Sequence, residues 1–135
     1  MNTLAQFWLV REFLPDMLAK NHGHIVNVSS VCGLQGGYKL TDYCSSKFAV
    51  AGFTESLRVE LGVLNPANRI GVTLVCPFHV QTKLFDGVEF SRMRWIRLSF
   101  TPDEVADAIV NGLLTNKSLV LIPRGLCYVY MAMKR

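Results

Sequence analysis

A tyrosine and a lysine stand four residues apart in the segment DYCSSK, residues 42–47. Four residues make about one turn of an α-helix, so Tyr43 and Lys47 would lie side by side if the segment is helical. A phenol has an ordinary pKa of about 10, too high for an effective base near neutral pH. An ammonium roughly 4 Å away would favour the phenolate by about 4 kcal/mol at an effective dielectric near 20. The pair predicts a tyrosine acid/base, although a solvated helix face can carry the same two residues.

Two more polar clusters follow apolar segments. Ser29 and Ser30 end HIVNVSS, thirteen residues before Tyr43, and PFHVQT, residues 77–82, follows IGVTLVCP. A hydroxyl at such a position can hydrogen-bond a substrate oxygen, but it can equally cap a helix or end a strand. Their position relative to Tyr43 depends on the elements around them.

Composition narrows the function classes. The chain has 135 residues, of which 50% are hydrophobic and 18% charged. This length suits one domain, and the composition predicts a buried sheet or a surface covered by another component. The net charge of +4 comes from scattered basic residues, and only RMRWIR at 92–97 concentrates them. We therefore expect no nucleic-acid partner.

The cysteines and histidines do not form a metal motif. No CxxC pair occurs, and the spacings between successive cysteines are 12, 32 and 51 residues. These spacings fit no common zinc site, so reduced and mostly buried thiols are expected. The residues concerned are Cys32, Cys44, Cys76, Cys127, His22, His24 and His79.

Helices and strands are expected to alternate along the chain. Helical periodicity or end signals predict helices over 3–20, 42–62 and 101–115, and apolar runs predict strands over 24–30, 70–77 and 118–123. Thr101, Pro102 and Glu104 together predict a capping box. Such alternation is typical of a parallel sheet with helices on both faces, whose chemistry lies beyond the carboxyl ends of the strands. The three polar clusters should meet at that edge.

With these motifs in this order, the chain resembles the short-chain dehydrogenase/reductase family. The resemblance rests on HIVNVSSVCG, YCSSK and PFHVQT and covers nearly all of residues 1–135. It implies a Rossmann-type parallel sheet and a single partial domain, the catalytic half. The family's catalytic Asn, Ser, Tyr and Lys fall on Asn2, Ser30, Tyr43 and Lys47.

The resemblance also implies roles for these residues and a cofactor. Tyr43 would be the acid/base, Ser30 would hold the substrate oxygen, and Lys47 would also bind the nicotinamide ribose. Asn2 would support a water in a proton relay. The nicotinamide contacts of the family, a Pro-Gly-x-Val/Ile-x-Thr segment, imply Pro77, Val80 and Thr82 as cofactor-binding residues, with Phe78 in place of the usual glycine. The cofactor would be NAD or NADP.

Within the family, the sequence is similar to the lipid-metabolising branch of retinol dehydrogenases and lipid-droplet 17-beta-hydroxysteroid dehydrogenases. The likeness implies a lipophilic alcohol or ketone as substrate. It also implies a location at the endoplasmic reticulum membrane or lipid droplets, on the cytosolic side, with a cytoplasmic protein as the alternative. The helices at 3–20 and 42–62 would form a homodimer interface.

The family's glycine-rich TGxxxGxG loop and cofactor-selecting residue have no counterpart here, so the N-terminal half of the domain is expected to be missing. Because glycines at a helix N-terminus cradle phosphates, this chain alone is expected to be inactive. Two other functions stay open. The chain could be an inactive fragment that binds full-length paralogues through the dimer helices, or a peripheral membrane protein using 92–97 and 125–133.

Overall fold

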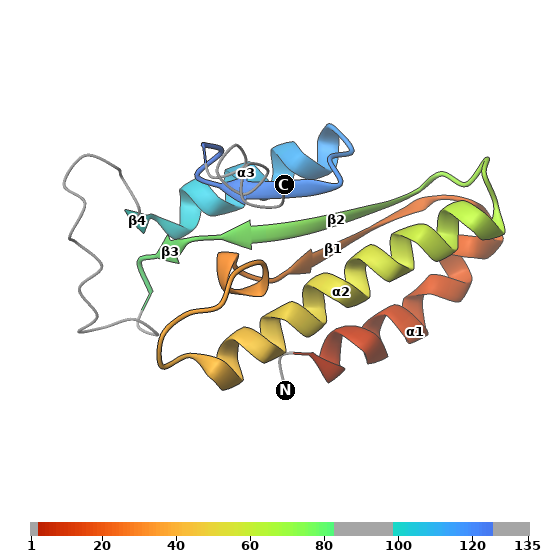
Figure 1. Cartoon of the computed structure of the whole chain (residues 1–135). Coiled ribbons are helices and arrows are strands. Elements are labelled where there is room, and N and C mark those ends of the chain that lie inside the picture. The colour runs from red at the N-terminus through yellow and green to blue at the C-terminus, as the bar shows by residue number, and fades with distance from the viewer. Residues whose placement is uncertain (1–2, 83–98, 126–135) are drawn as a thin grey trace.

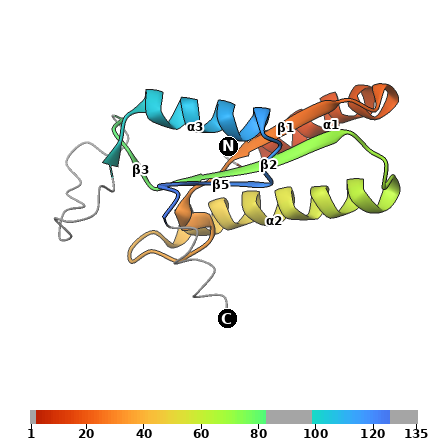
Figure 2. The ribbon, with the colours of Figure 1, turned by 90° about the horizontal axis from the view of Figure 1, so that it is seen from above.

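The computed structural model describes residues 3–82 and 99–125. Its elements are α1 (Leu4–Lys20), β1 (Gly23–Val28), the 3-10 turn η1 (Val31–Gly33), α2 (Thr41–Leu64), β2 (Ile70–Pro77), β3 (His79–Val80), β4 (Ser99–Phe100), α3 (Pro102–Leu114) and β5 (Leu119–Ile122). The main sheet has the strand order β1-β2-β5, and all three strands are parallel (Figure 1). Helices α2 and α3 cover opposite faces of it (Figure 2). The predicted α/β fold is confirmed.

The long elements agree with the sequence predictions, and the differences are local. Helix α2 continues to Leu64, so Gly62 lies inside it and does not end it. A 3-10 turn follows β1 where a loop was expected. The short strands β3 and β4 pair in parallel as a separate two-stranded sheet, which was not predicted. Two-residue strands are too short to show a periodic pattern, so no sequence signal marked them.

The core lies on both faces of the central strand. All eight residues of β2 are buried, as expected for a parallel strand with helices on either side. One cluster joins Val72 to α1 and α2 through residues such as Val10 and Leu57. The cluster on the opposite face joins Val75 to Val105 of α3.

Helix α3 begins with the predicted capping box. The Thr101 hydroxyl accepts from the Glu104 N–H at 3.3 Å, and the Glu104 carboxylate accepts from the Thr101 N–H at 2.9 Å. These bonds satisfy two backbone donors that a helix start leaves without partners. The helix packs on β2 and β5, which orders the edge of the sheet where those strands end.

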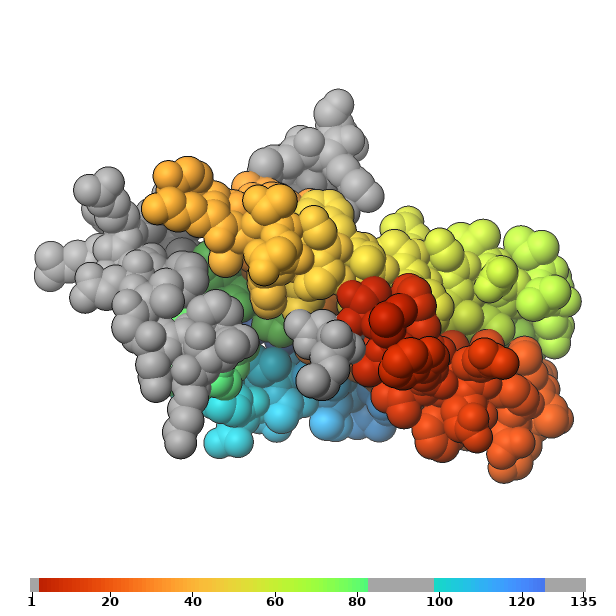
Figure 3. All heavy atoms as spheres, turned by 90° about the horizontal axis from the view of Figure 1, so that it is seen from below, coloured from red at the N-terminus to blue at the C-terminus, as the bar shows by residue number. Residues whose placement is uncertain are grey.

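Helix α1 is poorly covered for its composition. It lies beside α2 on the face seen in Figure 3, where the Phe7 and Phe53 rings are 4.2 Å apart. Only Val10 of its residues is buried, whereas Trp8 is 65% and Phe13 57% exposed. Helix α1 therefore carries exposed apolar surface of the kind that the composition predicted. Within residues 3–82 and 99–125, no helix is long and apolar enough to cross a membrane.

Candidate active site

Ser30 stands at the carboxyl end of β1, where its hydroxyl joins two strands. Its backbone is extended, and its side chain caps η1 by accepting from the Cys32 N–H at 3.2 Å. The same hydroxyl donates to the carbonyl of Pro77, the last residue of β2, at 3.4 Å. Ser30 is only 7% exposed. The Ser30 oxygen therefore lies at the carboxyl end of the strands, as predicted from the sequence.

The turn that carries Ser30 packs on α2. The Ser29 hydroxyl donates to the Lys47 carbonyl at 2.8 Å, which ties the end of β1 to the helix. Gly33 faces the same carbonyl, and a Cβ there would lie within 2.6 Å of that oxygen. The sequence analysis did not assign Ser29 and Gly33 to the site. The Ser-Ser pair and the glycine four residues after Ser29 were the available signals, but neither reveals a contact with Lys47, which is distant in the sequence.

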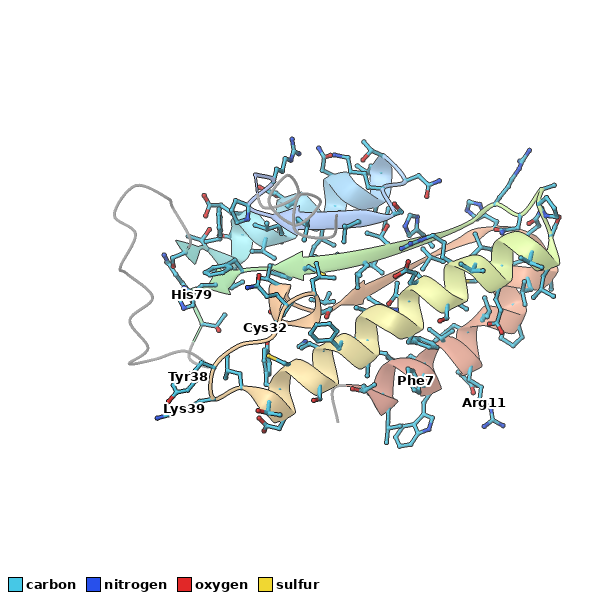
Figure 4. The ribbon with its side chains drawn as sticks, viewed as in Figure 1. Phe7, Arg11, Cys32, Tyr38, Lys39 and His79 are labelled. Carbon is cyan, nitrogen blue, oxygen red and sulfur yellow. The ribbon has the colours of Figure 1, made fainter. Side chains whose placement is uncertain are left out.

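Tyr43 and Lys47 occupy the first turns of α2, one turn apart as predicted. The Lys47 ammonium lies 5.8 Å from the centre of the Tyr43 ring. It donates a hydrogen bond of 3.4 Å to the carbonyl of Val28, the last residue of β1. Ser30 interacts with the Tyr43 phenol, so Ser30, Tyr43 and Lys47 are brought together. Cys32 lies on the adjoining turn, with Tyr38 and Lys39 in the loop that leads into α2 (Figure 4).

The electrostatics of Tyr43 differ from the expectation. Burial raises the pKa of the Tyr43 phenol above its ordinary value, and hydrogen bonding with Ser30 opposes this only in part. Burial also lowers the pKa of the Lys47 ammonium. Burial, which opposes the effect expected from Lys47, therefore decides the direction of the Tyr43 pKa here, and the acid/base role of Tyr43 stays a prediction. The physical reason is that burial disfavours the phenolate, while Lys47 is engaged by the Val28 carbonyl.

The segment after β2 contributes one direct contact to the cluster. Pro77 is buried and its carbonyl accepts from Ser30. Val80 lies in β3, half-buried against the core cluster beneath α3, and Thr82 is exposed at the end of the described segment. The cofactor roles of Pro77, Val80 and Thr82 stay predictions. Asn2 and the segments 92–97 and 126–133 lie outside the described residues.

The donor set suits one end of a nicotinamide cofactor. An ammonium carries three N–H donors, and Lys47 uses one of them on Val28, which leaves two for ribose hydroxyls. Tyr43 and Ser30 lie beside it at the carboxyl edge of a parallel sheet, where such ligands bind. The sequence has no GxGxxG motif for the pyrophosphate. The residues present therefore fit the nicotinamide ribose and not the phosphates.

Comparison with known proteins defines the class of this fold and site. The family described as short chain dehydrogenase matches residues 1–91. The short-chain dehydrogenase from Sphingobium yanoikuyae in complex with NADPH has a TM-score of 0.80 at 24% identity, over 98% of this chain and 50% of that one. A short-chain dehydrogenase/reductase from Burkholderia phymatum in complex with NAD has a TM-score of 0.72 at 25% identity, over 90% and 50%. The chain belongs to the short-chain dehydrogenase family.

Curated relatives indicate which members of the family the chain resembles. The chain is 41% identical to human 17-beta-hydroxysteroid dehydrogenase 13 over 123 residues, which are 91% of this chain and 39% of the relative. It is 38% identical to retinol dehydrogenase 10-B of Xenopus laevis over 135 residues, 99% of this chain and 39% of that protein. The chain therefore spans about two fifths of the length of these relatives. The predicted resemblance to retinol and 17-beta-hydroxysteroid dehydrogenases is confirmed.

Proposed function

We propose that the chain is the catalytic half of an NAD- or NADP-dependent oxidoreductase. It would interconvert a lipophilic alcohol with its ketone or aldehyde. The observation that carries this proposal is the meeting of Ser30, Tyr43 and Lys47 at the carboxyl edge of the sheet. Tyr43 and Lys47 are neighbours on one helix, whereas Ser30 comes from the end of β1, so the fold brings Ser30 to the pair.

The residues divide the proton chemistry among them. When bound, the nicotinamide supplies or accepts the hydride. The Tyr43 phenol donates a proton to the substrate oxygen in reduction, and its phenolate accepts one in oxidation. Ser30 hydrogen-bonds that oxygen, and Lys47 holds the ribose and favours the phenolate. Asn2 supports the proton relay, and Pro77, Val80 and Thr82 contact the nicotinamide.

The relatives support a proposal for the substrate class and the location. The names of the similar proteins refer to retinol and to 17-beta-hydroxysteroids. We therefore place the substrate among retinoids, steroids or other lipids. For the same reason we place the protein at the cytosolic face of the endoplasmic reticulum or of lipid droplets, where such substrates partition. A homodimer through α1 and α2 is the proposed assembly.

One observation favours a second function, an inactive fragment that binds full-length paralogues. Apolar side chains on the outer face of α2 are exposed, with Val59 at 61%, Val63 at 76% and Leu64 at 73%. Exposed apolar side chains on a helix are suited to packing against a partner helix. In this alternative, Ser30, Tyr43 and Lys47 are present but the chain catalyses no reaction.

Calorimetric titration with NADH and NADPH tests the proposed function. We expect no useful binding by the 135-residue chain. A chimera that joins it to the part of human 17-beta-hydroxysteroid dehydrogenase 13 preceding the matched region should bind one of the two at micromolar concentration. In the chimera, Lys47→Met should weaken cofactor binding about tenfold or more, because an ammonium–ribose interaction is worth more than about 1.4 kcal/mol.

Lys39→Met is the matched control, because Lys39 is exposed in the loop before α2 and faces the Tyr38 ring. It should leave cofactor affinity unchanged. Equal affinity of the Lys47→Met and Lys39→Met chimeras would remove the ribose role. Micromolar binding by the unmodified 135-residue chain would show that its half-site suffices.

A further inference from the structure

The backbone that follows β2 is attached to two other parts of the fold. The Phe78 N–H donates to the Ile122 carbonyl at the end of β5 at 2.8 Å, and the Gln81 N–H donates to the Phe100 carbonyl of β4 at 2.9 Å. Between these two bonds, β3 pairs in parallel with β4, beyond the end of the main sheet (Figure 1). The segment that the sequence analysis assigned to the nicotinamide therefore has a defined path.

The hydroxyl of Ser99 joins two side chains of this segment. The His79 Nδ1 atom lies 2.9 Å from the Ser99 oxygen, and the Gln81 amide nitrogen donates to the same oxygen at 3.2 Å. A hydroxyl has one donor and two acceptor positions, so Ser99 can accept from Gln81 while it donates to His79. Alternate residues of an extended segment point to the same side, which explains how one oxygen reaches both. His79 lies just beyond β2 (Figure 4).

The side chain between these two residues packs elsewhere. Val80 is half-buried against the core cluster that joins Val75 to Val105 of α3. Its partner in the short sheet is Phe100, which packs against the same cluster. The core therefore holds the Val80 side chain, while Ser99 holds the residues on either side of it. Together these contacts fix the backbone at Val80.

The proposed cofactor contacts assign no role to the three residues that share this oxygen. In the pattern Pro-Gly-x-Val/Ile-x-Thr, His79 and Gln81 occupy the two open positions, and Ser99 lies outside the pattern. The pattern therefore accounts for Val80 and Thr82 but not for what holds them in place. A segment that is already ordered loses less conformational freedom when a ligand binds, so its binding is tighter.

We propose that Ser99 is a positioning residue, which acts through His79 and Gln81 to hold Val80 and Thr82 where they contact the nicotinamide. The cofactor part of this inference rests on the proposed function. Ser99 has no assigned contact with the reacting atoms, so its effect is on cofactor affinity rather than on proton transfer. Removing its hydroxyl takes away the oxygen that His79 and Gln81 share. The segment must then be ordered when the cofactor binds, which weakens binding.

Nuclear magnetic resonance of the 135-residue chain tests the arrangement without a cofactor. Ser99→Ala should change the nitrogen chemical shift of His79 Nδ1 and speed amide exchange at Gln81 about threefold or more. The His24 ring, which makes a separate hydrogen bond to β2, should keep its shifts. Ser99→Thr retains a hydroxyl and should restore the parent values. Ser56→Ala, at an exposed position of α2, is the matched control and should change neither signal.

Calorimetric titration of the chimera tests the consequence for the cofactor. Ser99→Ala should weaken binding of the nucleotide that the parent chimera binds about fivefold or more, whereas Ser99→Thr and Ser56→Ala should bind like the parent. Gln81→Ala, a change at an exposed residue, removes one of the two bonds and should also weaken binding. Circular dichroism of each variant verifies the fold.

Two results would overturn the inference alone: unchanged His79 and Gln81 signals in Ser99→Ala, or equal nucleotide affinity of the parent and Ser99→Ala chimeras. Weaker binding that Ser99→Thr does not restore would also count against it, because the hydroxyl would then not be the cause. A parent chimera that binds neither NADH nor NADPH would overturn the proposed function, and the cofactor role of Ser99 with it.

Discussion

Tyr43 is held in a state that suits a proton donor better than a proton acceptor. Burial raises the pKa of its phenol, and the nearby thiols of Cys32 and Cys44 act in the same direction when ionised. Lys47, the cation that could oppose this, has its own pKa lowered by burial and donates to Val28. At the scale of the residue, burial therefore determines the direction of the Tyr43 pKa in this structure.

Spacing predicted where Ser30, Tyr43 and Lys47 lie but not their electrostatics. Ser30, Tyr43 and Lys47 were found from strand ends and from a one-turn interval, both of which depend on local sequence. The direction of the Tyr43 pKa depends on burial, which is a property of the folded chain. Ser29 and Gly33 were missed because their contacts with Lys47 join segments far apart in sequence.

Gly33→Ala should destabilise the fold because the site turn packs directly on the helix. A Cβ at position 33 would meet the Ser29 hydroxyl and the Lys47 carbonyl, neither of which can move freely. We expect a loss of about 1–3 kcal/mol in the free energy of unfolding, measured by urea denaturation. Gly36→Ala is the control, because a Cβ at Gly36 meets nothing within 4 Å. Equal stability of the two variants would contradict this packing.

The buried Cys76 thiol makes the stability of the fold decrease at alkaline pH. Burial raises the pKa of its thiol from 9.0 to about 12. Above pH 9 the unfolded chain loses this proton while the folded chain keeps it, so stability falls as pH rises. The loss is about 1.4 kcal/mol per pH unit, or about 2 kcal/mol between pH 9 and 10.5.

Urea denaturation at several pH values measures this effect. Cys76→Ala should start from a lower stability, because it leaves a small cavity, but should lose less of it between pH 9 and 10.5. The difference between the two slopes isolates Cys76 from other groups that titrate in the range. Parallel slopes for the parent and the variant would show that the thiol does not contribute.

At the scale of the elements, strong local signals were reliable. The capping box of α3 and the apolar run of β2 were both predicted from sequence, and β2 has the predicted bounds 70–77. Local hydrogen bonds and continuous burial determine these features. The end of α2 was less predictable, since Gly62 meets nothing within 4 Å and the helix continues through it. A glycine ends a helix only when a favourable cap competes with further helical bonds.

Thr101→Ala should lower stability by about 1 kcal/mol, because it removes the acceptor for the Glu104 N–H at the start of α3. Thermal unfolding followed by circular dichroism gives the change. Thr115→Ala, at the other end of the helix, is the control. Its hydroxyl donates to the Asn111 carbonyl at 2.6 Å, a local bond that contributes little to helices. A larger effect at Thr115 would contradict the role of the capping box.

At the scale of the whole molecule, the chain spans only part of the length of the proteins it resembles. The chain covers 39% of human 17-beta-hydroxysteroid dehydrogenase 13 and half of the Sphingobium structure. Exposed residues of α1 and strand β1 line the same groove. The sequence predicted an uncovered surface from composition and from the absent glycine loop. It could not predict the 3.4 Å hydrogen bond from the Lys47 ammonium to the Val28 carbonyl.

The most direct measurement is turnover of retinol and of a 17-beta-hydroxysteroid by the chimera and by its Tyr43→Phe variant. If Tyr43 transfers the proton, the variant should lose about a hundredfold or more in kcat while its cofactor affinity stays nearly unchanged. Tyr38→Phe is the control, because Tyr38 is 89% exposed in the loop before α2, and it should turn over like the parent. Turnover by Tyr43→Phe within a few-fold of the parent would contradict the assignment of Tyr43 as the acid/base.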